Sequence, residues 1–160
     1  MHDLRTFIDE KFPDLLLVQE TKLKKNSNPY LPGYLFYRQD GPQAHPSDGT
    51  GIFIKNSLYH VELFISNIDY ISNTIVKVTL PNQLPLIIAS VYVPCKPNRN
   101  FLNDVNKILN LNNSVIMCGD FNANHTNWNS RKKNFTGNAL VHFAQCNNLE
   151  ILTPPTPTRY

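Results

Sequence analysis

The chain has 160 residues, of which 41% are hydrophobic and 17% charged, a composition that fits one globular domain spanning residues 1–160 and leaves little room for two. Lys and Arg outnumber Asp and Glu by 15 to 12, and the net charge of +3 permits a polyanionic partner without requiring one. Three cysteines without C-x-x-C spacing, and no apolar run of about 20 residues, predict an intracellular, reduced protein that is not secreted and has no membrane partner.

Apolar residues at helical spacing open the chain over residues 4–12, with Asp3 as a candidate N-cap and Pro13 ending the pattern. The apolar run 15–18 follows at once and predicts a strand that is covered on both faces. A helix that feeds a buried strand is the second half of a βαβ unit, so we expect the first strand of that unit to lie outside this chain.

Short strand-like runs separated by turn residues fill the middle of the chain. They predict an antiparallel meander with one face packed. The expected strands are 34–38, 51–55, 59–65, 70–80 and 84–93.

A second helix and a second buried strand follow, predicted over 101–109 and 115–118. After a polar loop over 121–137, a weaker helical stretch covers 140–144 and a short strand is expected at 149–152. Buried helix–strand pairs on either side of an antiparallel middle favour a layered α/β fold with two sheets packed face to face and helices outside. A mixed α+β fold with a single sheet is the alternative.

Two acidic residues, Glu20 and Asp120, come directly after buried strands. Each carboxylate is expected at the end of its strand, where α/β sheets usually hold ligands, and two carboxylates meeting there are hard oxygen ligands for Mg²⁺ or Mn²⁺. The alternative for either acid alone is a loop or helix-capping role. The patterns GxxxxGK[ST], GxSxG, HExxH and GxGxxG are absent, so P-loop, serine-hydrolase, zincin and Rossmann functions are not first choices.

Three further residues strengthen this candidate site. Gly119 allows the backbone to bend close to a ligand, and Asn122 offers an amide donor and a carbonyl acceptor to a phosphate oxygen or a water. Tyr92 lies at the end of another strand, before Pro94, and its phenol can donate to a phosphate oxygen or, if its pKa falls near a metal, help to activate water. A half-buried strand tyrosine is the alternative interpretation.

Three motifs occur in order at strand ends, over residues 18–21 (VQET), 92–94 (YVP) and 119–123 (GDFNA). This set resembles the endonuclease/exonuclease/phosphatase superfamily over nearly the whole chain. The loop 124–130 (NHTNWNS) and the segment from 149 onward resemble the apurinic-like endonuclease domain of jockey-type non-LTR retrotransposons. The resemblance implies a four-layer α/β/β/α sandwich of two packed mixed sheets, incomplete because the first strand and the C-terminal strands are missing.

The resemblance also implies an activity, the Mg²⁺-dependent (or Mn²⁺-dependent) hydrolysis of a DNA phosphodiester. Glu20 and Asp120 would be metal residues, and Tyr92 would contact the scissile phosphate. Asp120 would orient or deprotonate the attacking water, and Asn122 would hold both Asp120 and the phosphate.

Double-stranded DNA is the implied partner, and a reverse transcriptase polyprotein is the implied context. The domain would then nick DNA, in the nucleus when it acts on chromosomal DNA. The residues expected to contact DNA are Lys22, Lys24, Asn124, His125, Trp128 and Arg131. His125 is expected first as a surface loop residue, and Trp128 first as a packing anchor.

The sequence departs from the family pattern at both ends. The family's Asn on the first strand and its Asp and Asp-His pair near the C-terminus have no counterpart in this chain, so we expect the chain to be a fragment of weak or no activity. The alternative functions are an abasic-site repair nuclease or a phosphomonoesterase of the same fold, and a non-catalytic relic.

Overall fold

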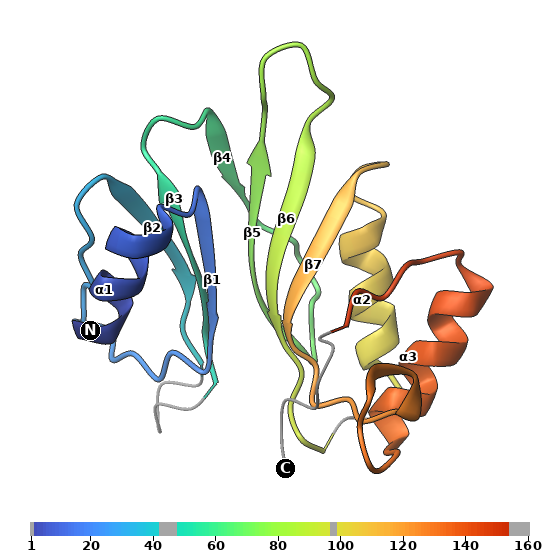
Figure 1. Cartoon of the computed structure of the whole chain (residues 1–160). Coiled ribbons are helices and arrows are strands. Elements are labelled where there is room, and N and C mark those ends of the chain that lie inside the picture. Colours follow the sequence, from blue (N-terminus) through green and yellow to red (C-terminus); the bar gives the residue numbers. More distant parts are fainter. Residues whose placement is uncertain (1, 42–47, 97–98, 154–160) are drawn as a thin grey trace.

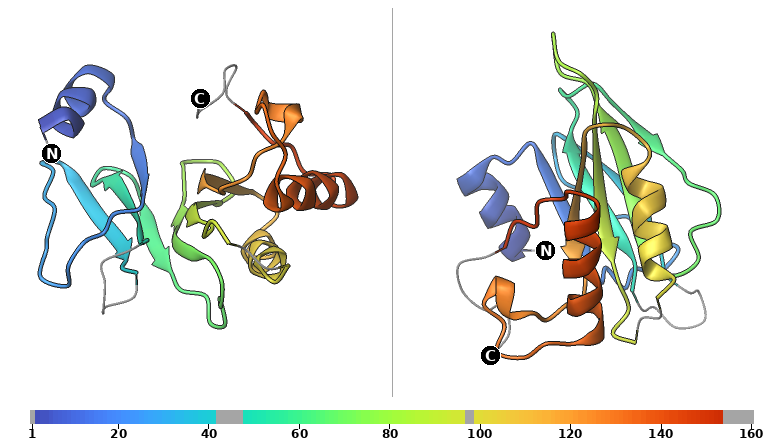
Figure 2. Two further views of the ribbon diagram at one scale, coloured as in Figure 1. Left: turned by 90° about the horizontal axis from the view of Figure 1, so that it is seen from below. Right: turned by 90° about the vertical axis from the view of Figure 1, so that its right-hand side faces the viewer.

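The computed structural model describes residues 2–41, 48–96 and 99–153, which form four layers (Figure 1). Helix α1 (His2–Lys11) covers the outer face of one sheet, and helices α2 (Phe101–Leu109) and α3 (Phe135–Cys146) cover the outer face of a second. The two sheets face each other between these helices, as the view from below in Figure 2 shows. No helix in the described ranges has the length and apolar character of a membrane span.

The first sheet contains three antiparallel strands in the order β1-β3-β2. They are β1 (Leu15–Gln19), β2 (Tyr34–Gln39) and β3 (Thr50–Lys55). Strand β1 lies at one edge of this sheet, and its last residues are hydrogen-bonded to Ser90 of the second sheet.

The second sheet contains four strands in the order β4-β5-β6-β7. The strands are β4 (His60–Leu63), β5 (Ser72–Val78), β6 (Leu86–Tyr92) and β7 (Val115–Asp120). Strands β4, β5 and β6 are antiparallel, whereas β6 and β7 are parallel and are connected through α2. Parallel pairing brings the carboxyl ends of β6 and β7 to the same edge of the fold.

Three apolar clusters fill the three gaps between the four layers. Alternate side chains of β3 point to opposite faces, so Phe53 packs with Ile8 under α1 while Ile52 and Ile54 pack between the sheets. The third cluster, which includes Phe101, lies between the four-stranded sheet and helices α2 and α3. The middle strands are therefore covered on both faces, and the helices cannot be removed without exposing apolar surface.

The predicted two-sheet arrangement is confirmed, and the single-sheet alternative is excluded. Of the two sheets, the four-stranded one is mixed and the three-stranded one is antiparallel in the described residues. The expected single meander with one packed face is wrong, because the chain passes from one sheet to the other between β3 and β4. Each half of the predicted meander then packs against the other half.

Two local predictions were also wrong. Asp3 lies inside α1 and not before it, since the helix begins at His2. Residues 149–152 form no strand: the amide of Leu149 donates to the carbonyl of Ala144 at the end of α3, and Leu152 is 85% exposed. An extended segment becomes a strand only when a neighbouring strand pairs with it, and within the described residues none does.

Asp104 on α2 provides a test of how the outer layer is held. Its side chain is 2% exposed, and its Oδ2 accepts hydrogen bonds from the backbone amides of Tyr70 at 2.7 Å and Asp69 at 3.2 Å, while Lys107 lies 3.2 Å from Oδ1. We predict that Asp104→Ala lowers the free energy of unfolding by about 2–4 kcal/mol, because it removes a buried carboxylate that accepts from several backbone amides and leaves those amides unpaired. Urea denaturation measures the change, and Asn106→Ala on the exposed face of the same helix is the control. An equal loss in both variants would contradict this role.

Candidate active site

Three predicted site residues meet at one end of the sandwich, the lower end in Figure 1. Tyr92 and Asp120 are the last residues of β6 and β7 and are register partners in the parallel ladder. Glu20 comes directly after β1 in the other sheet, and the Tyr92 phenol makes a hydrogen bond to its carboxylate. The acids expected to share a ligand are therefore joined through Tyr92, although they are 100 positions apart in the sequence.

The Tyr92 side chain lies among acidic groups. It is 5% exposed. Burial, followed by the hydrogen bond and charge of Glu20 and the charges of Asp48 and Cys95, raises the pKa of the phenol to about 12. The phenol is consequently protonated at neutral pH and serves as a hydrogen-bond donor. The sequence-based suggestion that its pKa falls near a bound metal stays a prediction.

Glu20 is held in an uncommon backbone conformation with φ +49°. The two residues after it are fixed to the loop before β3, since the amides of Thr21 and Lys22 donate to the carbonyls of Gly49 and Asp48 at 3.3 Å and 3.2 Å. The exposed carboxylate of Glu20 faces the Lys22 ammonium at 3.5 Å. Such an exposed pair contributes little to stability, so a cation of higher charge can replace the ammonium there.

Asp120 is oriented by the turn that follows β7. Its Oδ1 accepts a hydrogen bond from the backbone amide of Asn122 at 2.9 Å, and Asn122 has φ +45°. The side-chain Nδ2 of Asn122 donates to the carbonyl of Val93 at 2.9 Å. Asn122 therefore holds Asp120 through its main chain, while its amide group joins the turn to the end of β6.

Gly119 has a structural purpose that was not expected. A Cβ atom at this position would lie 1.8 Å from the carbonyl oxygen of Val91, its register partner on β6. The close approach that the structure shows is to the neighbouring strand, and the approach to a ligand stays a prediction. Any side chain here would push apart the two strands that carry Tyr92 and Asp120.

The loop after Asp120 departs most from expectation. His125 is 7% exposed and not at the surface: it caps the short 3₁₀ helix η1 (Thr126–Trp128), with Nδ1 accepting from the amide of Asn127 at 3.1 Å. Trp128 lies beside it, with ring centroids 5.3 Å apart, and its indole N–H donates to the carbonyl of Ala123 at 3.0 Å. The structure thus supports the packing role for Trp128 and corrects the surface position expected for His125.

The other residues expected to contact DNA are exposed. They are Lys22, Lys24, Asn124 and Arg131. Lys22 lies next to Glu20, and the carbonyl of Lys24 accepts from the guanidinium of Arg38 at 3.4 Å. Asn124 and Arg131 belong to the loop between β7 and α3.

Asn134 is a site-supporting residue that the sequence analysis missed. Its Oδ1 accepts from the amides of Asn124 at 2.9 Å and Gly137 at 2.8 Å, and its Nδ2 donates to the carbonyl of Asn122 at 2.7 Å. The side chain joins the turn that holds Asp120 to the first turn of α3. An asparagine directly before a helical stretch is a cap signal that could have identified it.

Asp48 is the second residue that was missed. Its carboxylate acts on Tyr92, yet in the sequence it stands in a turn-forming segment with no apolar run before it. Nothing in that local pattern indicates a site.

The oxygen donors at this end fit a hard divalent cation. Mg²⁺ is usually bound by one or two carboxylates and completes its shell with water and substrate phosphate, and Glu20 and Asp120 are two such carboxylates. Among the described residues, no group of three or more His, Cys, Asp or Glu side chains is placed to hold an ion by itself. The arrangement suits a metal shared with substrate.

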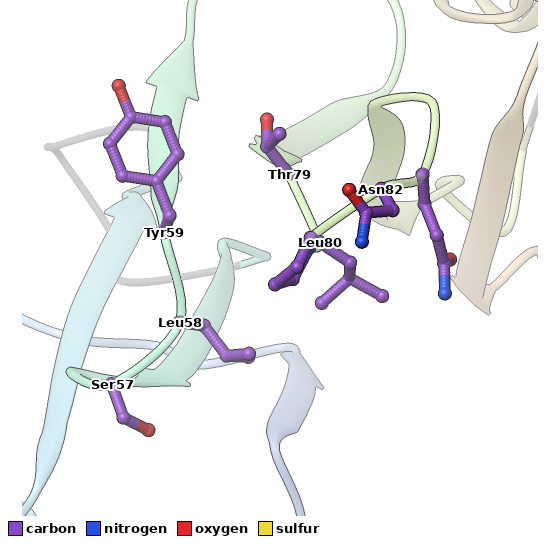
Figure 3. Close-up of a pocket in the computed structure, with 8 residues that line it drawn as sticks. Ser57, Leu58, Tyr59, Thr79, Leu80 and Asn82 are labelled. Carbon is purple, nitrogen blue, oxygen red and sulfur yellow. The ribbon is translucent and has the colours of Figure 1, made fainter.

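A cavity of about 460 Å³ lies at the opposite end of the sandwich (Figure 3). It is lined by the residues that connect β3 to β4 and β5 to β6, namely 57–59 and 79–83. None of the predicted site residues is among them. The cavity is therefore separate from the candidate site.

Comparisons with known sequences agree with the resemblance seen in the motifs. A family model described as "Endonuclease-reverse transcriptase" matches residues 86–160. The "RNA-directed DNA polymerase from mobile element jockey" of Drosophila melanogaster is 29% identical over 161 residues, and the protein of the same name from Drosophila funebris is 26% identical over 160. Each match covers 99% of this chain and 17% of the relative, so the chain spans about a sixth of the length of these relatives.

Solved structures agree with the fold. The endonuclease domain of TRAS1, a telomere-specific non-LTR retrotransposon, superposes with a TM-score of 0.76 and 18% identity over 95% of this chain and 68% of that chain. The catalytic domain of Xenopus laevis APE2 gives a TM-score of 0.62 with 15% identity over 88% of this chain and 62% of that chain. These likenesses confirm the expected layered α/β fold with two packed sheets.

Asn134 offers a test of how the turn at Asp120 is held. We predict that Asn134→Ala lowers the free energy of unfolding by about 1–3 kcal/mol, because it removes an N-cap and leaves the amides of Asn124 and Gly137 unpaired. Thermal denaturation measures the loss, with Asn138→Ala on the exposed face of α3 as the control. If Asn134→Ala is as stable as the wild type, the side chain is not the link described above.

Proposed function

We propose that this domain, which has the fold of the endonuclease/exonuclease/phosphatase superfamily and resembles the endonuclease domain of jockey-type non-LTR retrotransposons, nicks DNA for a retroelement polyprotein that also carries a reverse transcriptase. One observation supports the proposal above all others: the Tyr92 phenol is hydrogen-bonded to Glu20, which follows a strand of the other sheet, and Asp120 is the register partner of Tyr92 on the neighbouring strand. The matched relatives named as RNA-directed DNA polymerases support the polyprotein context.

The proposed reaction is the hydrolysis of a DNA phosphodiester. A divalent cation such as Mg²⁺ or Mn²⁺, held by Glu20 and Asp120, would supply charge neutralisation at the phosphate. Asp120 orients the attacking water and accepts its proton, and the amide of Asn122 keeps that carboxylate in place. Asn122 Nδ2 carries two hydrogens, so it would contact the phosphate with the one that is not donated to the carbonyl of Val93.

Tyr92 is proposed as the hydrogen-bond donor to a non-bridging phosphate oxygen. Because its pKa is raised to about 12, the phenol keeps its proton throughout the neutral range. In the structure described here it donates to Glu20, and a phosphate would compete for the same proton. The role of Tyr92 is therefore to bind and orient the phosphate.

The exposed residues around the site are proposed to bind the DNA backbone. Lys22, Lys24 and Arg131 would attract phosphates irrespective of base sequence, and Asn124 would donate a hydrogen bond. Trp128 would shape the loop, and the buried ring of His125 would act through Trp128. Action on chromosomal DNA would place the domain in the nucleus.

Two other functions of the same fold remain as outcomes of the test, an abasic-site nuclease and a phosphomonoesterase, beside a chain with no catalytic activity. Supercoiled plasmid, an abasic duplex and an inositol phosphate, each incubated with the purified chain and Mg²⁺, distinguish them. Turnover of the inositol phosphate alone would overturn the nuclease proposal, and turnover of the abasic duplex alone would make the domain a repair nuclease.

We predict that the 160-residue chain converts supercoiled plasmid to the nicked form in Mg²⁺ and that Asp120→Asn lowers the rate by about 100-fold or more, because the group that accepts the proton is lost. The wild-type rate itself is expected to be low, since the sequence contains no Asp-His pair of the kind that the resemblance implies. Asp9→Asn on α1 is the matched control. Equal nicking by wild type and Asp120→Asn would rule out the assigned role.

We predict that Glu20→Gln weakens Mn²⁺ binding by about tenfold or more, because a neutral amide is a poorer ligand for a hard cation than a carboxylate. Isothermal titration calorimetry measures the affinity, and Glu10→Gln on the exposed surface of α1 is the control. Saturable binding that survives Glu20→Gln unchanged would show that the ion lies elsewhere.

A further inference from the structure

Catalysis at the proposed site needs a fixed distance between two separate sheets. Glu20 follows β1 in the three-stranded sheet, whereas Tyr92 and Asp120 end strands of the four-stranded sheet. No backbone ladder joins the two sheets among the described residues. Contacts between side chains across the gap must therefore set how β1 sits over β6.

Ser90 makes such a contact at the site end of the gap. It lies on β6 two residues before Tyr92, so it shares a face of the strand with Tyr92, and it is wholly buried. Its Oγ donates to the carbonyl of Val18 at 3.1 Å and accepts from the Nε2 of Gln19 at 2.9 Å. Both partners are on β1, directly before Glu20.

The position of this serine is informative because this face of β6 changes from apolar to polar along the strand. Leu86 and Ile88 face the cluster between the sheets, whereas Ser90 and Tyr92 carry hydroxyl groups, and a buried hydroxyl is unfavourable unless it is hydrogen-bonded. Apolar contacts are not directional, so they allow two sheets to slide over each other by a fraction of a residue. The Oγ of Ser90 donates one hydrogen bond and accepts another, and because hydrogen bonds are directional this restricts such sliding far more.

The segment around Glu20 is then held on both sides. Before it, Val18 and Gln19 are bonded to Ser90, and after it, the amides of Thr21 and Lys22 are bonded to the loop before β3. Glu20 itself has φ +49°, a conformation that a free strand end does not favour. Contacts on both sides of Glu20 therefore hold the backbone in this conformation.

We propose that Ser90, together with Gln19, is a positioning residue that fixes the Glu20 carboxylate over Tyr92 for binding of the divalent cation. It touches neither the phosphate nor the ion and acts through β1. The expected effect of Ser90 on metal affinity rests on the proposed function. Its structural part, that the hydroxyl of Ser90 holds the segment at Glu20, is independent of any activity.

The experiment uses the full chain and the variants Ser90→Ala, Gln19→Ala and the double variant. In Ser90→Ala we expect Mn²⁺ binding, measured by calorimetry, to weaken about fivefold to tenfold, as follows from the loss of one to two hydrogen bonds. Gln19→Ala should weaken Mn²⁺ binding less than Ser90→Ala does. The double variant should bind Mn²⁺ as well as Ser90→Ala, because both substitutions remove the same contact between β1 and β6. Gln19 is only partly buried, so its variant keeps the test open if Ser90→Ala fails to fold.

A second measurement needs no metal. Amide hydrogen exchange by NMR should be at least about tenfold faster at Thr21 and Lys22 in Ser90→Ala than in the wild type. The reason is that the segment around Glu20 loses its contact with Ser90 and is then held on one side, by the hydrogen bonds of these two amides. Asp104→Asn is the control for general destabilisation, because Asp104 is on α2, which covers the face of the four-stranded sheet that is turned away from β1. In Asp104→Asn, the ratio of the exchange rate at Thr21 to that of the core amides should stay within about twofold of wild type. The Mn²⁺ affinity of the folded chain should also stay within about twofold.

The outcomes separate the two proposals. Equal effects of Ser90→Ala and Asp104→Asn, or no effect of Ser90→Ala on exchange at Thr21 and Lys22, would overturn the positioning role. Faster exchange in Ser90→Ala, in a wild-type chain that neither binds Mn²⁺ nor nicks DNA, would support the contact and overturn the proposed function. Faster exchange with unchanged Mn²⁺ affinity would overturn the link between Ser90 and the metal.

Discussion

The hydrogen bond between the Tyr92 phenol and the Glu20 carboxylate joins two sheets that share no backbone pairing in the described part of the chain. The position of Glu20 relative to the other candidate site residues depends on how the two sheets pack. The parallel ladder places Asp120 beside Tyr92, but only the packing of sheet on sheet places Glu20 there. A site divided in this way requires the inter-sheet contact to be well defined, because a small slide of one sheet would separate the acids.

The gap between the sheets changes in character from one end to the other. At the end near the cavity it is filled by apolar residues such as Ile54, Val78 and Leu86. At the site end it contains hydroxyl and amide groups bonded across the gap, including Thr50 with Thr74 at 2.8 Å and Ser90 with Gln19. Burial of apolar surface at one end stabilises the packing of the two sheets, whereas the directional hydrogen bonds at the other end fix their relative position.

The loop after β7 shows how a short motif can be recognised correctly and explained wrongly. GDFNA marks the site, yet Gly119 is needed for contact with Val91, and Asn122 holds Asp120 by its main chain. His125, expected first at the surface, is buried and caps the 3₁₀ helix, whereas Trp128 has the packing role that was expected first. Such roles could not be read from the sequence, because a polar residue in a loop is equally compatible with contacting solvent, ligand or backbone.

The sequence alone determined most of the helices and strands, including those that carry Tyr92 and Asp120 and the one that precedes Glu20, because apolar periodicity and breaking residues are local properties. It also determined the family resemblance. Only the tertiary structure decided that the middle strands divide between two sheets, that Asp48 lies near Tyr92, and that Asn134 and Ser90 support the site. Those facts depend on contacts between residues far apart in the chain, and no local pattern encodes which strand will face which.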